Sequence, residues 1–203
     1  MEINSVNPPS SMGRRKLASP RTQLDRGNWI ENAIDVLAHD GVGGLRVEVL
    51  AKRCGVTKGS FYWHFKDRQD LLAAILEHWK EGRIRDIEKT TSVTPGKERE
   101  QLHFAIEVYG ASRNRKGMSI ELAVRDWARH DPQAATVVEA VDLYRLECTR
   151  KLFVAAGMSD AEAKSRSLLL YACVFGLSLM HYTHFDDNLD DLKERIAERI
   201  VSA

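Results

Sequence analysis

Two short amphipathic segments separated by a glycine constrain the fold of this chain more than any other feature. The first covers residues 47–53, and its apolar side chains lie on one side of a helix. Gly55 follows where the backbone must turn sharply, and the second segment begins at Thr57. Phe61 and Phe65 are one helical turn apart, so we expect both to pack against the preceding helices. The spacing predicts two helices joined by a tight turn.

Helical periodicity continues on both sides of this pair. Residues 26–40 repeat apolar side chains every three to four positions, as in an amphipathic helix, and Gly41 is placed to end it. A fourth helix is expected from Asp67 to about Glu88. No alternating pattern persists for more than a few residues, so the sequence predicts an all-α protein. The other predicted helices cover residues 97–112, 118–130, 132–156, 159–184 and 189–201.

Residues with short polar side chains stand at several of these helix starts. Thr57 and Asp67 are expected to cap the free amides of the third and fourth helices. Ser159 with Glu162 has the spacing of a capping box, and Pro132 is suited to a first helical position.

Charge is divided unevenly along the chain, although its total is only +1. Residues 14–68 hold 11 Lys or Arg against 6 Asp or Glu, a local net charge of +5, which leaves −4 for the rest. A basic front attached to an acidic body is typical of a protein that contacts phosphates with one end only.

Residues 56–72, VTKGSFYWHFKDRQDLL, resemble the DNA-binding domain of the TetR family of bacterial regulators. The resemblance is specific over about residues 26–79 and concerns only the helical layout beyond them. It implies a three-helix, helix-turn-helix DNA-binding domain over 26–72 and a helical ligand-binding and dimerisation domain over 73–203. We expect residues 1–25, with their serines, prolines and basic run, to form a disordered basic arm.

The second short helix of the motif is the predicted recognition helix. Its first turn, Thr57 to Ser60, combines free amides with small side chains, so phosphates and base edges can approach closely. Lys58 and Ser60 are the best candidates for base contacts. The resemblance implies phosphate contacts for Tyr62, His64 and Lys66, and Trp63 is expected to pack on a sugar or a thymine methyl group. The predicted DNA-binding residues are Arg46, Thr57, Lys58, Gly59, Ser60, Tyr62, Trp63, His64 and Lys66.

The sequence departs from the family pattern at the start of the first short helix. Arg46 stands where relatives commonly carry a serine or threonine cap, and Glu48 where an arginine is common. Arg46 can still reach a phosphate, whereas Glu48 would repel the DNA backbone or accept a hydrogen bond from a cytosine amine. The operator sequence of relatives therefore does not transfer to this chain.

The rest of the chain is predicted to bind a small molecule and to form a homodimer. The apolar run over residues 168–177 indicates a helix buried on more than one face, and the resemblance implies that helices over 159–184 and 189–201 build the dimer interface. Aromatic and apolar residues of the middle helices are candidates for the ligand cavity, although aromatic residues at helical spacing more often belong to the plain core. These candidates are Phe104, Val108, Trp127, Tyr144, Tyr171 and Phe175.

The expected protein is a cytoplasmic, ligand-responsive transcriptional regulator, usually a repressor in this family. Its expected partners are a double-stranded DNA operator, an effector of unknown identity and a second copy of the chain, with no cofactor and no membrane. Cys54, Cys148 and Cys173 suggest neither a disulfide framework nor a zinc site. His181 with His184 is a conceivable but weaker metal sensor.

Two other classes of function stay open at this point. The chain would be a helical dimeric interaction module if its helix-turn-helix served packing only. An enzyme is less well supported, since Cys173 lies in an apolar run without a neighbouring base and no Ser-His-Asp signature is evident.

Overall fold

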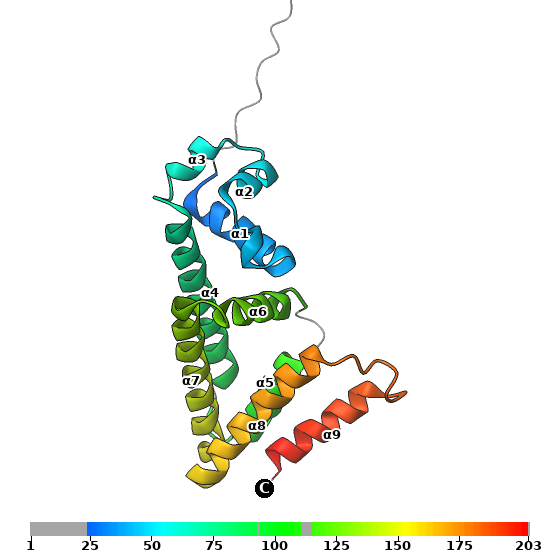
Figure 1. The fold of residues 1–203 in the computed structure, drawn as a ribbon. Helices are drawn as coiled ribbons and strands as arrows, with labels where there is room; N and C mark the ends of the chain where they lie inside the picture. Colours follow the sequence, from blue (N-terminus) through cyan, green and yellow to red (C-terminus); the bar gives the residue numbers. More distant parts are fainter. Residues whose placement is uncertain (1–23, 93, 111–114, 203) are drawn as a thin grey trace, which may run out of the picture.

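The structure, a computed structural model, describes residues 24–92, 94–110 and 115–202, and its regular elements in these ranges are all helices (Figure 1). The all-α fold with an N-terminal helix-turn-helix is therefore confirmed. The elements are α1 (Arg26–Asp40), the 3-10 turn η1 (Val42–Gly44), α2 (Val47–Arg53), α3 (Lys58–Tyr62), α4 (Arg68–Thr91), α5 (Glu98–Gly110), α6 (Arg115–Ala128), α7 (Pro132–Ala155), α8 (Asp160–Leu179) and α9 (Leu189–Val201). The predicted arm, residues 1–25, lies almost wholly outside the described residues.

The head, which comprises α1, η1, α2 and α3, is built around an aromatic core. Trp29 of α1 and Phe61 of α3 are both 0% exposed, and their rings meet edge to face with centroids 5.5 Å apart. Phe65 is also buried and stacks on Phe61 at 5.2 Å. The predicted inward positions of both phenylalanines are confirmed. Large aromatic side chains of this kind dominate the energy of a small core, so they fix α3 firmly on α1.

α4 connects the head to the rest of the molecule as one uninterrupted helix. The Asp67 side chain accepts a hydrogen bond from the Asp70 amide and caps the helix as predicted. The helix runs to Thr91, a little beyond the predicted end near Glu88. Its buried face, which includes Ile75 and Trp79, joins a continuous apolar cluster with α1, α6 and α7. Figure 1 shows α4 descending from the head beside α7.

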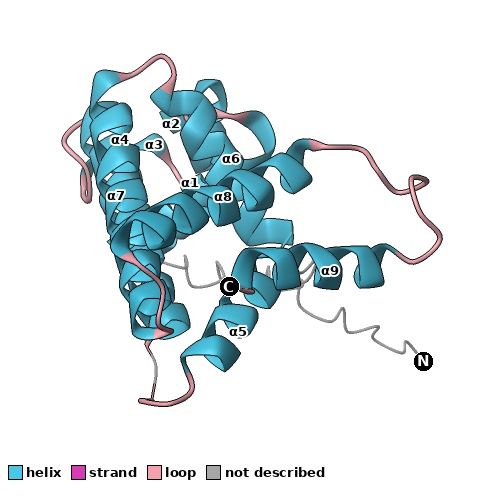
Figure 2. Cartoon of the chain, turned by 90° about the horizontal axis from the view of Figure 1, so that it is seen from below, coloured by secondary structure: helices cyan, strands magenta, loops and turns pink. Residues whose placement is uncertain are grey.

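The body, α5 to α9, has a second apolar cluster around Leu102, Phe153, Leu170 and Ile200. A long loop connects α8 to α9 (Figure 2). In the single chain one face of α8 is buried and another leaves Leu168 61% exposed, so the predicted burial of a second face, which was assigned to a dimer interface, stays a prediction. No helix among the described residues is long and apolar enough to cross a membrane.

The end of α8 differs most from its predicted position. α8 ends at Leu179 rather than at residue 184, and Met180 is extended. Residues 181–184 are His, Tyr, Thr and His, all weak helix formers, and a turn follows in which the Phe185 amide donates to the Tyr182 carbonyl.

The predicted cap at the start of α3 is also wrong. Thr57 occupies the capping position, but its side chain makes no capping hydrogen bond. The Ser60 amide instead donates to the Thr57 backbone carbonyl at 3.0 Å. The Thr57 hydroxyl is thus not used in capping this helix.

Candidate DNA-binding site

The turn between α2 and α3 sets the direction of the second helix. Gly55 has φ +67°, a left-handed conformation that glycine adopts without steric cost. The amides of Cys54 and Val56, the two residues that flank Gly55, both donate hydrogen bonds to backbone carbonyls of α2. The turn therefore ends α2 and orients α3 so that Phe61 packs against Trp29.

The opposite side of α3 is exposed at the end of the molecule farthest from α9 (Figure 1). Trp63 is 86% exposed and Tyr62 59%, although Tyr62 also meets Phe61 edge to face. Ser60 and His64 are half-buried, and the remaining predicted contacts are exposed: Arg46, Thr57, Lys58, Gly59 and Lys66. All nine predicted DNA-binding residues thus lie on α3 or on residues adjacent to α2 and α3, and none of them is buried.

Gly59 has no packing reason to be a glycine. A Cβ atom added there would meet only the Thr57 hydroxyl, at an ordinary contact distance of 3.6 Å. A glycine inside a helix costs about 1 kcal/mol relative to alanine. The absence of a side chain therefore favours an external reason, such as close approach of a partner to the helix surface.

An ion pair links the two short helices on the exposed side of the head. The Lys58 Nζ atom lies 2.7 Å from Glu48 Oε1, and both side chains are more than half exposed. This hydrogen bond, with a smaller effect of the nearby Arg46 charge, lowers the pKa of the Glu48 carboxyl. The predicted base-contacting lysine is thus held by the residue that departs most from the family pattern.

Two residues that the sequence analysis did not single out support this face. Arg68 of α4 donates from Nε to the Leu45 carbonyl at 2.6 Å and from a terminal nitrogen to the Val42 carbonyl at 3.0 Å. Asp70 accepts a hydrogen bond from the Lys66 amide at 3.0 Å. The spacing of Asp67 and Asp70 at the start of α4 was the available sequence signal for the second of them.

The predicted ligand-binding residues are distributed over three environments. Phe104 and Val108 of α5 are 45% and 40% exposed. Trp127 of α6 is buried in the cluster shared with the head. Tyr144 lies at the surface of α7, whereas Tyr171 and Phe175 lie on the inward side of α8. The six differ in burial and in the helices that carry them, and they stay predicted ligand contacts.

The hydroxyl groups of the two tyrosines among these six residues already have protein partners. The Tyr144 hydroxyl donates to Glu88 at 2.9 Å, and the Tyr171 hydroxyl lies 3.0 Å from the Thr149 hydroxyl. Neither hydroxyl therefore needs a ligand to satisfy its hydrogen bonding.

A network of four charged residues, two of them buried and two partly exposed, lies between α6 and α7, and the sequence analysis missed it. Arg125 bonds both Glu121 and Asp142, and Arg145 bonds the same two carboxylates. Glu121 and Arg145 are each 3% exposed. The Arg125 guanidinium also lies 4.1 Å from the ring centroid of Phe175. Glu and Arg at positions i and i+4 of a helix have the spacing of a solvent-exposed ion pair, so the sequence pattern did not predict that they would be part of this network.

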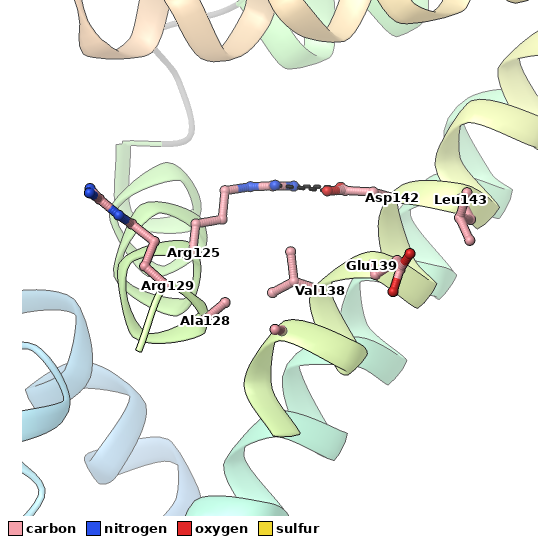
Figure 3. Close-up of a pocket in the computed structure, with 8 residues that line it drawn as sticks. Arg125, Ala128, Arg129, Val138, Glu139, Asp142 and Leu143 are labelled. Atoms are coloured by element: carbon pink, nitrogen blue, oxygen red, sulfur yellow. Dashed lines mark hydrogen bonds and ion pairs between the residues drawn. The ribbon is translucent and has the colours of Figure 1, made fainter. Parts of the chain in front are cut away.

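Two atoms of this network are buried without a hydrogen-bond partner, Oε2 of Glu121 and Nε of Arg145. An open pocket of about 350 Å³ lies next to the network, between α6 and α7 (Figure 3). Figure 3 shows Arg125 of α6 reaching across to Asp142 of α7, with the Val138 side chain below this pair. None of the six predicted ligand-binding residues lines it. Among the described residues, no group of three or more His, Cys, Asp or Glu side chains is arranged to hold a metal ion.

An exposed, cationic and aromatic helix carried by a tight turn on a three-helix core defines a helix-turn-helix DNA-binding domain. Residues 30–75 match the model of "Bacterial regulatory proteins, tetR family". The head and the start of α4 are therefore similar to the N-terminal part of proteins of that family.

Curated relatives show the same similarity over the same short stretch. The HTH-type transcriptional regulator AcrR of Shigella flexneri is 38% identical over 55 residues, which are 27% of this chain and 26% of the relative. The tetracycline repressor protein class A from transposon 1721 of Escherichia coli is 41% identical over 56 residues, 28% of this chain and 26% of the relative. The matched segment thus spans about a quarter of the length of each relative.

Solved structures extend the similarity of fold to most of the chain. A member of the TetR family from Streptomyces coelicolor A3 is 22% identical with a TM-score of 0.61, covering 88% of this chain and 98% of that one. A structure from Saccharomonospora viridis solved in complex with choline is 17% identical with a TM-score of 0.71, covering 87% and 94%. The body therefore shares its fold, though little of its sequence, with these proteins.

Proposed function

We propose that this chain is a DNA-binding transcriptional regulator, acting as a repressor that a small molecule releases from its operator. The observation that carries the proposal is the exposed side of α3 and its neighbours, where Lys58, Tyr62 and Trp63 face outward while Phe61 holds the helix in place. Side chains of these types bind phosphates, sugars and base edges.

We propose a homodimer as the DNA-binding form. One face of α8 leaves Leu168, Leu169 and Leu179 more than half exposed, and an apolar face of this kind on a long helix is suited to a twofold interface. Two heads in such a dimer would reach half-sites one helical turn of DNA apart, about 34 to 36 Å. The proposed partners of this dimer are the DNA operator and the small-molecule effector. We place the dimer in the cytoplasm, where a bacterial regulator meets its DNA.

The effector is proposed to act through α4. This helix begins under α3, at Asp67, and its second half packs along α7, whose residues also form the buried charge network. A ligand that binds the body better in one arrangement of α4 would favour that arrangement and change the separation of the two heads. The structurally similar protein solved with choline supports a small-molecule site in a body of this fold.

The decisive experiment is a titration of the full chain with duplex DNA at two salt concentrations, together with its mass by sedimentation. A dimer whose affinity falls steeply as salt rises is expected, because phosphate contacts release counterions. A monomer, or a protein without salt-sensitive affinity for any duplex, contradicts the proposal.

The alternative, a helical dimeric interaction module without regulatory DNA binding, predicts a different result in the same titration. Such a protein would dimerise but would show no salt-dependent affinity for DNA. The 86% exposure of Trp63 weighs against it, because a motif retained only for packing has no use for an exposed tryptophan.

A further inference from the structure

Glu48 and Lys58 form a hydrogen-bonding unit on the DNA-facing side of the head. Their side chains come from the first turns of α2 and α3 and meet at 2.7 Å. Each is about 60% exposed, 61% for Glu48 and 58% for Lys58. A carboxylate among exposed cations on a surface that meets phosphates is unfavourable for DNA binding unless it has a partner in the complex.

The pair retains free hydrogen-bonding capacity on both members. An ammonium group has three donors and a carboxylate has about four acceptor positions, so the bond between them leaves donors on Lys58 and acceptors on Glu48. The unit therefore presents a donor and an acceptor side by side. In the major groove, a G·C pair presents the complementary groups, the acceptors O6 and N7 of guanine beside the amino donor of cytosine.

We propose that Glu48 and Lys58 together read one G·C base pair in each half-site, with Lys58 donating to guanine and Glu48 accepting from the cytosine amine. This inference rests on the proposed DNA-binding function and assigns to it a base pair and a specificity-determining residue. It also explains why an acidic residue is tolerated on this face, since the cytosine amine compensates the carboxylate only at the correct sequence.

The same pair reduces binding to DNA of arbitrary sequence. While Glu48 holds Lys58, the lysine charge is neutralised and does not add to the attraction for phosphates. Removal of the carboxylate frees one cation, so the slope of log affinity against log salt on an arbitrary duplex becomes steeper by about 0.9. Affinity for that duplex rises about two- to fivefold, the range expected when an exposed ion pair no longer competes.

The test selects binding sites from a pool of randomised duplexes, with the full-length protein and its Glu48→Ala and Lys58→Met variants. The wild type is expected to select G·C at a position that both variants then lose, by about fivefold or more, while the other selected positions persist. Glu77→Ala is the matched control, since it removes a carboxylate from an exposed ion pair with Lys80 on α4. The control should select the same sites as the wild type.

Three results would overturn the inference. The first is a Glu48→Ala variant that keeps the full preference at every position, and the second is one that changes binding no more than Glu77→Ala does. The third is a Glu48→Ala variant that loses preference at all positions together, which would show that Glu48 supports the head as a whole. A wild type that selects no sequence contradicts the proposed function itself and is distinguished by the absence of any selected position before a variant is tested.

Discussion

The head and the body are held together by different kinds of interaction. In the head, Trp29, Phe61 and Phe65 stack in a core that is at most 1% exposed. In the body, α6 meets α7 through a buried network of opposite charges that includes Glu121 and Arg145. Aromatic rings buried in a core have no other group to pack against. Charged side chains in a network can exchange their hydrogen bonds for bonds to a polar ligand. The difference suits a rigid reading platform attached to a responsive body.

The largest effect that sharpens this comparison is expected in the head. Replacing Phe61 by alanine removes the ring that touches both Trp29 and Phe65 and should lower the free energy of unfolding by about 4 kcal/mol. Urea denaturation measures the change. Trp63→Ala is the control, because its side chain is 86% exposed and its loss should change stability by no more than about 0.5 kcal/mol. Equal effects of the two substitutions would show that α3 is not anchored as described.

In the body, a slightly smaller loss is expected from Arg145→Met. The substitution leaves the buried Glu121 carboxylate with Arg125 alone, which should cost about 3 kcal/mol. Adding Glu121→Gln removes the uncompensated charge and should restore part of that stability, as measured by denaturation of both variants. A cost of Arg145→Met below about 1 kcal/mol would argue that the network contributes little to the body.

Arg46→Ala tests the head as a DNA-binding platform without disturbing its core. Affinity should fall for every duplex sequence, and the salt slope should become less steep by about 0.9, the value for one lost phosphate contact. Fluorescence anisotropy at several salt concentrations measures both. Arg85→Ala, which removes an exposed arginine from α4, is the control. An unchanged slope in Arg46→Ala would refute a phosphate contact.

The smallest effect concerns the contact between α4 and α7. The hydrogen bond to Glu88 raises the pKa of Tyr144 from its usual value near 10 to about 12. Because the folded pKa is raised, the contact contributes stability below pH 10 and loses it as the pH rises through about 12. In an ultraviolet titration, the late tyrosinate step should vanish in Tyr144→Phe and move toward pH 10 in Glu88→Gln. An unshifted step in Glu88→Gln would contradict this contact.

The head was accessible to prediction because its information is local. The i, i+4 spacing of Phe61 and Phe65 and the glycine at 55 encode the packing and the turn within a few residues. Arg68 was not foreseen, because its partners are the carbonyls of Val42 and Leu45, more than 20 positions earlier. Every residue has a backbone carbonyl, so the sequence does not indicate which carbonyl accepts a hydrogen bond.

The body illustrates the opposite case. Helix boundaries there follow from local signals: Pro132 stands at the start of α7, and the Ser159 side chain accepts the expected hydrogen bond from the Glu162 amide. Its interior does not follow, because Arg125 and Asp142 are 17 positions apart and each has the pattern of a solvated side chain. The pocket beside this network is lined by small, aliphatic and charged side chains, so a search for aromatic residues could not indicate it. The boundary between residues 72 and 73 and all assigned contacts stay predictions.

The unbroken course of α4 has a mechanical consequence. A helix of 24 residues is about 36 Å long at 1.5 Å per residue, so pivoting it by about 10° would displace one end by roughly 6 Å relative to the other. Successive base pairs are about 3.4 Å apart along the duplex axis. A rotation of α4 by about 10° would thus shift the head along the DNA by nearly the length of two base pairs.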